Sequence, residues 1–267
     1  MLLQTWRWFG PRDRITFDEI RQSGAQAIVT ALHHVPVGEV WPVNEIRKRK
    51  ELIESAGFTW RIVESVPVHE DIKKQTGNYR EYIDNYKQTL LNLAGCGIKT
   101  VCYNFMPILD WSRTNLVYKT LDGSEVTRFE YFKFIAFDVH ILKRKGAENS
   151  YPARVVEKAG KYVATLSNEE IHKLKHTVLL GLPGSGETFS LEQLRAKLAE
   201  YAGIDRITLK EHLYYFLREI MPISEQEGIL LAIHPDDPPW SLMGLPRIVS
   251  TDSDMQDILK VADTPSN

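Results

Sequence analysis

The chain has 267 residues, of which 43% are hydrophobic and 25% are charged, and its 33 Lys and Arg residues nearly balance its 35 Asp and Glu residues. This composition excludes a disordered, a collagen-like and a disulfide-rich protein, and it is typical of a globular one. The formal net charge of −2 provides no broad basic field, so we expect neither nucleic acid nor a membrane as a partner.

The cysteine content and the amino-terminal segment bear on the compartment. A chain of this length with only two cysteines, Cys96 and Cys102, is typical of a reducing compartment, where disulfides are rare. The first eight residues, MLLQTWRW, are too few and too polar to form the apolar part of a signal peptide, and no apolar run is long enough to span a membrane. We therefore expect a soluble, cytoplasmic protein.

Five short apolar runs predict β-strands. Each run has about four to six residues, many of them β-branched, and most lead into a polar residue and then a proline. Runs of this kind, without strict alternation, are typical of strands that are buried on both faces of a parallel sheet. In chain order, the predicted strands cover residues 2–6, 27–32, 60–63, 100–103 and 229–233.

Helical patterns follow several of these runs. Pro42 opens a helix over residues 43–53 that ends before Gly57, and Asn78 caps a helix over residues 79–94 that ends at Gly95. In both segments apolar residues recur every three or four positions, as on the buried face of an amphipathic helix. The same spacing predicts helices over residues 209–220 and 252–259.

Residues 111–208 separate the fourth predicted strand from its helix, and we expect them to form an insertion. Within it, apolar runs at 116–118 and 126–129 flank Asp122-Gly123, which predicts a β-hairpin. Residues 132–142 predict a mostly apolar helix, and residues 167–170 predict the start of another. Residues 181–186 are glycine-rich but lack the Lys-Ser/Thr of a phosphate-binding loop, so they predict a surface loop.

The repetition of strand, loop and helix predicts an α/β fold with a parallel sheet. Because no Gly-x-Gly-x-x-Gly motif follows any predicted strand, a (β/α)₈ TIM barrel is favoured over a dinucleotide-binding sheet. Such a barrel has eight strands in about 250 residues, whereas five are predicted here. We therefore expect a single, incomplete TIM-barrel domain over residues 1–267, made of about the first five βα units and the insertion at 111–208 after the fourth strand.

Polar side chains follow the predicted strands at their carboxyl ends, where functional residues lie in barrels of this kind. Their imidazole and carboxylate groups suit a divalent ion such as Mn²⁺, Fe²⁺ or Zn²⁺. A single histidine is more often structural, but His234 follows an uninterrupted apolar strand and precedes a rigid Pro-Asp-Asp-Pro-Pro turn. The strand-end set comprises His33, His34, Glu64, His69, Asn104, Asp110, His234, Asp236 and Asp237.

Several longer motifs resemble the mannonate dehydratase family. They extend over essentially the whole chain, and their length makes them much more specific than a single short pattern. The motifs are TWRWFGP at 5–11, VTALHH at 29–34, GEVW at 38–41, VESVPVHEDIK at 63–73, VCYNFMP at 101–107, AIHPDDPP at 232–239 and GLPRIVST at 244–251.

The resemblance implies a xylose-isomerase-like TIM barrel that dehydrates D-mannonate to 2-dehydro-3-deoxy-D-gluconate in hexuronate (glucuronate) catabolism, as a homo-oligomer with Mn²⁺ or Fe²⁺ as cofactor. It also implies that His234 is a metal ligand. The other ligands of the family, a Cys, a second His and an Asp, and its catalytic Arg, His and Tyr are expected beyond Asn267. The catalytic residues are therefore unknown within this chain, which we expect to be inactive by itself.

Dehydration of a 2,3-dihydroxy acid requires a base for the proton α to the carboxylate, stabilisation of the resulting enediolate, and an acid for the departing 3-hydroxyl. The candidates for binding the polyol substrate are His33, Glu64, Asn104 and Asp236. Two alternatives remain at this point. One is a metal-dependent sugar isomerase or epimerase of the same barrel class, and the other is an inactive barrel remnant.

Overall fold

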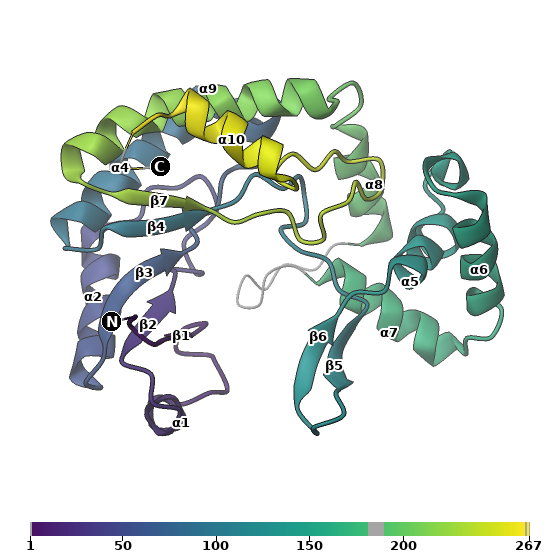
Figure 1. Ribbon diagram of the computed structural model, residues 1–267, viewed down its shortest axis with the longest axis horizontal. Helices are drawn as coiled ribbons and strands as arrows, with labels where there is room; N and C mark the ends of the chain where they lie inside the picture. Colours follow the sequence, from purple (N-terminus) through teal and green to yellow (C-terminus); the bar gives the residue numbers. More distant parts are fainter. Residues whose placement is uncertain (1, 181–189, 265, 267) are drawn as a thin grey trace. The chain divides into compact units, whose positions relative to one another are not determined.

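A computed structural model describes residues 2–180, 190–264 and 266 (Figure 1). The chain divides into two compact units, each of which is described here by itself. The sheet unit comprises Met1–Phe105, Arg206–Pro235 and Ile248–Asn267, and the hairpin unit comprises Met106–Asp205 and Asp236–Arg247. The predicted organisation as one domain with an insertion at 111–208 stays a prediction.

Within its described residues, the sheet unit contains a five-stranded sheet in the order β1-β2-β3-β4-β7, and every neighbouring pair is parallel. The predicted α/β fold and all five predicted strands are thereby confirmed. The first strand begins later than predicted, because its pairing with β2 starts at Thr5, opposite Ala27, and Leu2 remains 94% exposed. The strands are β1 (Thr5–Arg7), β2 (Ala27–Thr30), β3 (Thr59–Glu64), β4 (Thr100–Tyr103) and β7 (Leu230–Ile233).

The two faces of this sheet differ in burial. One face packs against helices, and its Trp60, Val63, Val101 and Tyr103 side chains are buried. The other face carries Arg7, Glu64, Cys102 and Ala232 by register, and these residues are partly or fully exposed. The expectation that the strands are buried on both faces is therefore wrong for β1, β3, β4 and β7 within this unit, because its helices cover a single face. Among the described strands of the unit, β2 alone is buried at every position.

The helices on the buried face follow the predicted amphipathic segments. In Figure 1, α2 (Val43–Ser55), α4 (Tyr79–Gly95) and α9 (Arg206–Glu227) lie along one side of the sheet. The Phe216 ring of α9 lies 5.1 Å from the Tyr86 ring of α4 and 6.1 Å from the Tyr103 ring of β4, so the two helices and the strand share one core. Aromatic contacts at such distances stabilise packing beyond the area that they bury.

Some helix boundaries differ from the predictions. Asn78 is the N-cap residue of α4, but its side chain makes no capping hydrogen bond and instead donates to Glu81 Oε2 at 3.2 Å. The helix predicted over 209–220 is longer and continues through Pro222 to the end of α9. The last predicted helix is confirmed as α10 (Asp252–Val261), whereas the short helices α1 (Phe17–Gln22) and α3 (Glu70–Lys74) were not predicted.

The hairpin unit confirms the elements predicted within residues 111–208. Strands β5 (Asn115–Lys119) and β6 (Glu125–Arg128) pair antiparallel, and Gly123 adopts φ +85° in the turn that joins them. The predicted apolar helix consists of α5 (Tyr131–Ala136) and a π-helical continuation over Phe137–Leu142. Helix α7 (Asn168–Leu179) begins at a reciprocal cap between Ser167 and Glu170, as predicted.

Two helices of this unit were not predicted, namely α6 (Ala153–Val163) and α8 (Leu191–Ala199), and a 3₁₀ turn covers Ala147–Ser150. The loop predicted over residues 181–186 lies outside the described residues. None of the helices in the described part of the chain has the length and apolar character needed to cross a membrane.

A buried carboxylate organises the interior of the hairpin unit. Asp138 has no exposed side-chain surface, accepts two charge-assisted hydrogen bonds from Arg144 at 3.0 and 2.7 Å, and accepts a third from the Tyr151 hydroxyl at 2.6 Å. Burial, followed by the Asp138 charge, raises the pKa of Tyr151, so its hydroxyl keeps the proton that it donates. The same hydroxyl oxygen accepts the backbone N–H of Met243 at 3.1 Å and so ties the segment at 236–247 to the rest of the unit.

We expect Tyr151→Phe to lower the free energy of unfolding by about 1–3 kcal/mol, because it leaves a buried carboxylate oxygen and a buried N–H with one partner fewer. Urea titration followed by circular dichroism measures the change. Tyr118→Phe is the matched control, since Tyr118 lies on the exposed surface of the hairpin, and a change within about 0.5 kcal/mol is expected there. Equal effects of the two substitutions would contradict the role of the Asp138 network.

Candidate functional site

The carboxyl ends of the five parallel strands bring several of the predicted site residues to one edge of the sheet. Glu64 is the last residue of β3, His33 and Asn104 follow β2 and β4 closely, and His234 follows β7 directly. A backbone hydrogen bond extends the pairing past the strand ends, since the backbone N–H of His234 donates to the carbonyl oxygen of Tyr103 at 2.7 Å. Asp236 belongs to the hairpin unit and is described separately.

Glu64 is paired with a residue that the sequence analysis did not identify. Its Oε2 atom lies 3.5 Å from Nε of Arg7, the last residue of β1, and the two side chains are 35% and 24% exposed. Cys102 is the register partner of Glu64 on β4. Burial, and after it the Glu64 charge, raises the pKa of Cys102 to about 11, so the thiol is protonated at neutral pH. Only the position of Arg7 at a strand end could have identified it from the sequence.

His33 lies in an apolar and positively charged environment. Its Nε2 atom is buried and has no hydrogen-bond partner within the described part of the chain, and its ring lies 6.2 Å from the Phe9 ring. Burial, then the charges of Arg7 and Arg49, lowers the pKa of His33 to about 4. The imidazole is therefore neutral at physiological pH, with one nitrogen that donates and one that accepts.

Arg49 of α2 fixes the segment that carries His33. Its Nη1 atom donates to the carbonyl oxygen of Ala31 at 2.8 Å, and its guanidinium lies 5.4 Å from the Trp8 ring. Arg49 is only 8% exposed, and it contacts the end of β2 from the face of the sheet that the helices cover. Asn104, after β4, is also buried, at 6% exposure.

Two of the predicted strand-end histidines have local structural partners. The Nε2 atom of His34 lies 3.1 Å from Glu45 Oε2 of α2, and this pair is largely exposed. His69 caps α3 by accepting the N–H of Asp71 at 3.0 Å, and its ring stacks on Tyr82 at 3.8 Å. These contacts explain both residues without a ligand.

His234 has an exposed side chain whose Nδ1 atom lies 2.6 Å from the carbonyl oxygen of Pro235. This contact favours the tautomer in which Nδ1 carries the proton, so that Nε2 offers its lone pair to a metal ion. His234 therefore fits a divalent ion as one ligand. Among the described residues, no group of three or more His, Cys, Asp and Glu side chains is close enough to hold a metal ion. The assignment of His234 as a metal ligand stays a prediction.

Asp236 and Asp237 are both held by arginines within the hairpin unit. Asp236 is buried and lies 4.0 Å from Nη1 of Arg247, which is itself buried. Asp237 accepts two parallel hydrogen bonds from Arg113, at 3.0 and 2.6 Å. A bidentate pair of this kind fixes the orientation of the carboxylate as well as its position. Neither arginine was predicted, because each is recognised only through a partner that the fold brings to it.

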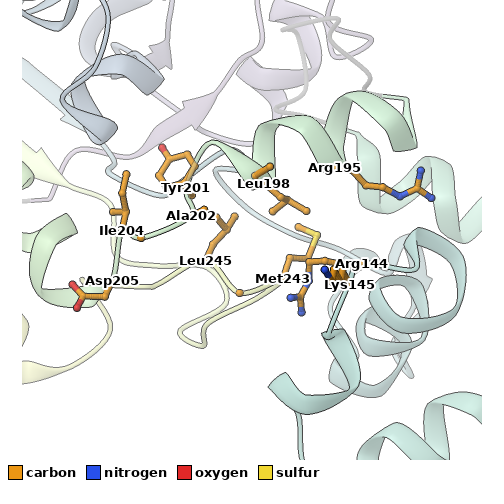
Figure 2. Close-up of a pocket in the computed structure, with 13 residues that line it drawn as sticks. Arg144, Lys145, Arg195, Leu198, Tyr201, Ala202, Ile204, Asp205, Met243 and Leu245 are labelled. Carbon is orange, nitrogen blue, oxygen red and sulfur yellow. The ribbon is translucent and has the colours of Figure 1, made fainter.

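A pocket of about 780 Å³ lies within the hairpin unit (Figure 2). Arg144, Lys145 and Arg195 give its wall a basic character, and Tyr201, Met243 and Leu245 supply apolar surface. Arg144 is already bound to Asp138, and Arg195 donates to the carbonyl oxygen of Leu142 at 2.9 Å. None of the residues predicted for the site is among those that line it in the described structure.

Comparisons with known proteins place these observations in a family. The family model described as D-mannonate dehydratase (UxuA) matches residues 2–267. The mannonate dehydratases of Marinomonas sp. (strain MWYL1) and Chromohalobacter salexigens are 56% and 52% identical over 263 residues, which cover 98% of this chain and 67% of each relative. The chain thus spans about two thirds of the length of these relatives.

A solved structure indicates the same family. The crystal structure of mannonate dehydratase from Streptococcus suis serotype 2 matches with a TM-score of 0.73 and 32% identity, over 100% of this chain and 63% of that one. Sequence and structure therefore agree over nearly every residue of the chain. We conclude that the chain belongs to the mannonate dehydratase family.

Proposed function

We propose that the protein dehydrates D-mannonate to 2-dehydro-3-deoxy-D-gluconate. The observation that carries this proposal is the 56% identity to a mannonate dehydratase over 98% of the chain. The named relatives are dehydratases, which favours dehydration over the isomerase alternative. The five parallel strands with polar residues at their carboxyl ends support a (β/α)₈ barrel as the framework of the whole protein.

The residues of the sheet unit suit the binding of a polyhydroxy acid. Glu64 can accept a hydrogen bond from a hydroxyl group, and neutral His33 can donate one and accept another. Asn104 adds an amide that does both, and its burial keeps that amide in a fixed position. We assign these three residues to the orientation of the substrate hydroxyls, and we keep Asp236 of the hairpin unit as a separate candidate for substrate binding.

We further propose that Mn²⁺ or Fe²⁺ is the cofactor and that His234 is one of its ligands. When bound, such an ion stabilises the negative charge that develops on the substrate as the proton α to the carboxylate leaves. The Nδ1 contact of His234 supports this assignment, because metal-bound histidines commonly have their second nitrogen fixed by a carbonyl oxygen.

Cellular context follows from the same proposal. We propose a cytoplasmic homo-oligomer that acts in glucuronate catabolism, with no nucleic acid or membrane as a partner. The formal net charge of −2 supports the last point, because binding to a polyanion relies on clustered positive charge.

The function is tested by the formation of a 2-keto acid from D-mannonate in the presence of Mn²⁺. We expect product from this sequence when it is joined to the part of the Marinomonas dehydratase that the chain does not cover, and the intact Marinomonas enzyme is the positive control. A joined protein that is folded and binds Mn²⁺, yet forms no 2-keto acid, would contradict the proposed function.

The same assay tests whether the 267 residues are inactive by themselves, which stays a prediction. The chain alone is compared with the joined protein at equal concentration. Turnover by the chain alone within about tenfold of the joined protein, roughly 1.4 kcal/mol in activation free energy, would show that the expectation of inactivity is wrong.

A further inference from the structure

Arg7 has more hydrogen-bond donors than the contacts around it use. Its guanidinium has five N–H groups, and its ion pair with Glu64, at 3.5 Å, is longer than a good hydrogen bond. Its Nη1 atom is buried and has no hydrogen-bond partner in the described parts of the chain. The guanidinium carbon of Arg7 lies 4.7 Å from the centroid of the Phe9 ring, a cation–π contact that helps to hold the group in place.

His33 shares this environment. The Phe9 ring that supports Arg7 also lies 6.2 Å from the His33 ring, and the buried Nε2 atom of His33 has no partner among the described residues either. A buried polar group without a partner is costly, so two of them around one aromatic ring indicate that an acceptor completes the cluster. Glu64 is partly exposed at the same strand ends, so a small molecule can reach this edge of the sheet.

The charges of the cluster indicate what kind of acceptor it takes. Arg7 and Arg49 each contribute one positive charge, Glu64 and Asp13 each contribute one negative charge, and His33 is neutral. The cluster therefore suits a singly charged anion and not a doubly charged phosphate, which Glu64 would repel. A planar carboxylate also matches the fork of the guanidinium, which binds two oxygens at once.

We propose that Arg7 and His33 form the subsite for the carboxylate of the sugar-acid substrate, with Arg7 donating to the carboxylate and His33 donating to a neighbouring oxygen. The proposal rests on the proposed function, because it takes a sugar acid as the substrate. It adds Arg7, on the edge strand β1, to the residues that bind it.

The test is calorimetric titration of the metal-stripped protein with D-mannonate and with D-mannitol. Mannitol has the same hydroxyl chain but a neutral CH₂OH group in place of the carboxylate, and removal of the metal leaves the protein as the only partner for that carboxylate. We expect D-mannonate to bind at least tenfold more tightly than D-mannitol. Arg7→Gln is expected to bring the ratio close to one by weakening D-mannonate alone, and Arg7→Lys to have a smaller effect.

Arg14→Gln is the matched control, since it removes the same charge from an exposed side chain of the same amino-terminal segment and should leave the ratio unchanged. If Arg7→Gln does not fold, His33→Asn takes its place, and we expect it to weaken D-mannonate about fivefold to tenfold. The proposal is overturned if the wild-type protein does not prefer D-mannonate, or if the variant that folds weakens both ligands equally or neither.

These measurements need no turnover, so they separate the proposal from the function on which it rests. A protein that forms no 2-keto acid but shows an Arg7-dependent preference for D-mannonate would contradict the dehydratase function and support the carboxylate subsite. An active enzyme without that preference would support the dehydratase function and contradict the carboxylate subsite.

Discussion

His234→Ala is expected to weaken Mn²⁺ binding by more than the roughly 10–100-fold that loss of an outer-shell partner costs, since it removes a ligand itself. The side chain is exposed, and its Nδ1 contact to Pro235 leaves Nε2 available, so the substitution removes a ligand without leaving a cavity in the core. The substitution is made in the joined protein, and titration with Mn²⁺ followed by elemental analysis after dialysis measures affinity and stoichiometry. Dehydration of D-mannonate should be lost in parallel.

His172→Ala is the matched control, because His172 lies on an exposed position of α7 in the hairpin unit. Its removal should leave Mn²⁺ affinity unchanged and so account for nonspecific binding by surface histidines. An unchanged stoichiometry and affinity in His234→Ala would show that His234 is not a ligand.

Asp254→Asn is expected to lower the free energy of unfolding by about 3 kcal/mol at neutral pH, because it discharges one partner of a buried ion cluster. The Asp254 side chain is 2% exposed, pairs with Lys210 at 2.7 Å and with Arg206, and accepts the backbone N–H groups of Ser250 and Thr251 at 3.1 and 3.0 Å. The residue thus joins the start of α10 to α9.

The stabilisation by Asp254 should depend on pH in a defined direction. Burial alone would raise the pKa of this carboxyl, but the hydrogen bonds from Lys210, Arg206 and Ser250 outweigh it and hold the pKa well below its usual range. The stabilisation is therefore complete above the pKa of the unfolded chain, about 3.9, and declines as the pH falls below it toward the folded value. The difference between wild type and Asp254→Asn should shrink as the pH is lowered from about 4 to 2.

Asp257→Asn provides the control on the same helix. Asp257 also pairs with Lys210, at 3.1 Å, but it is 38% exposed, so the loss should be below about 1 kcal/mol and should decrease in high salt. Urea titrations at several pH values compare the three proteins. A pH-independent difference between wild type and Asp254→Asn would contradict the proposed charge cluster.

The positions of the strands could be predicted because they depend on local patterns. Four of the five predicted strands begin within one residue of the observed start, and the hairpin follows from Asp122-Gly123 between two short apolar runs. Helix α6 was missed although its sequence carries the same kind of pattern, because Val155, Val156, Ala159, Tyr162 and Val163 recur at helical spacing and pack on one hydrophobic cluster. The sequence could not show that helices cover a single face of the sheet in this unit, because Ile62 and Leu230 are apolar and yet are not fully buried.

The site could be predicted in part for a related reason. Parallel strands bring their carboxyl ends together, so His33 and Glu64 were correctly placed at the same edge, and Arg7 links them electrostatically. Arg113 could not be identified, because its partner Asp237 is 124 residues away in the sequence. The interaction of His34 with Glu45 could not be predicted either, because a contact across a loop leaves no pattern in the sequence.

The interleaving of the two units has a consequence for how the chain can be cut and recombined. The chain passes from one unit to the other at 105/106, 205/206, 235/236 and 247/248, so the hairpin unit is made of two separate stretches. Arg113 in the first stretch binds Asp237 in the second, and Tyr151 in the first binds the backbone of Met243 in the second. Excision of residues 106–205 would therefore leave the segment at 236–247 without the partners that order it. A gene fusion that transfers the hairpin unit to another protein must therefore carry both stretches together.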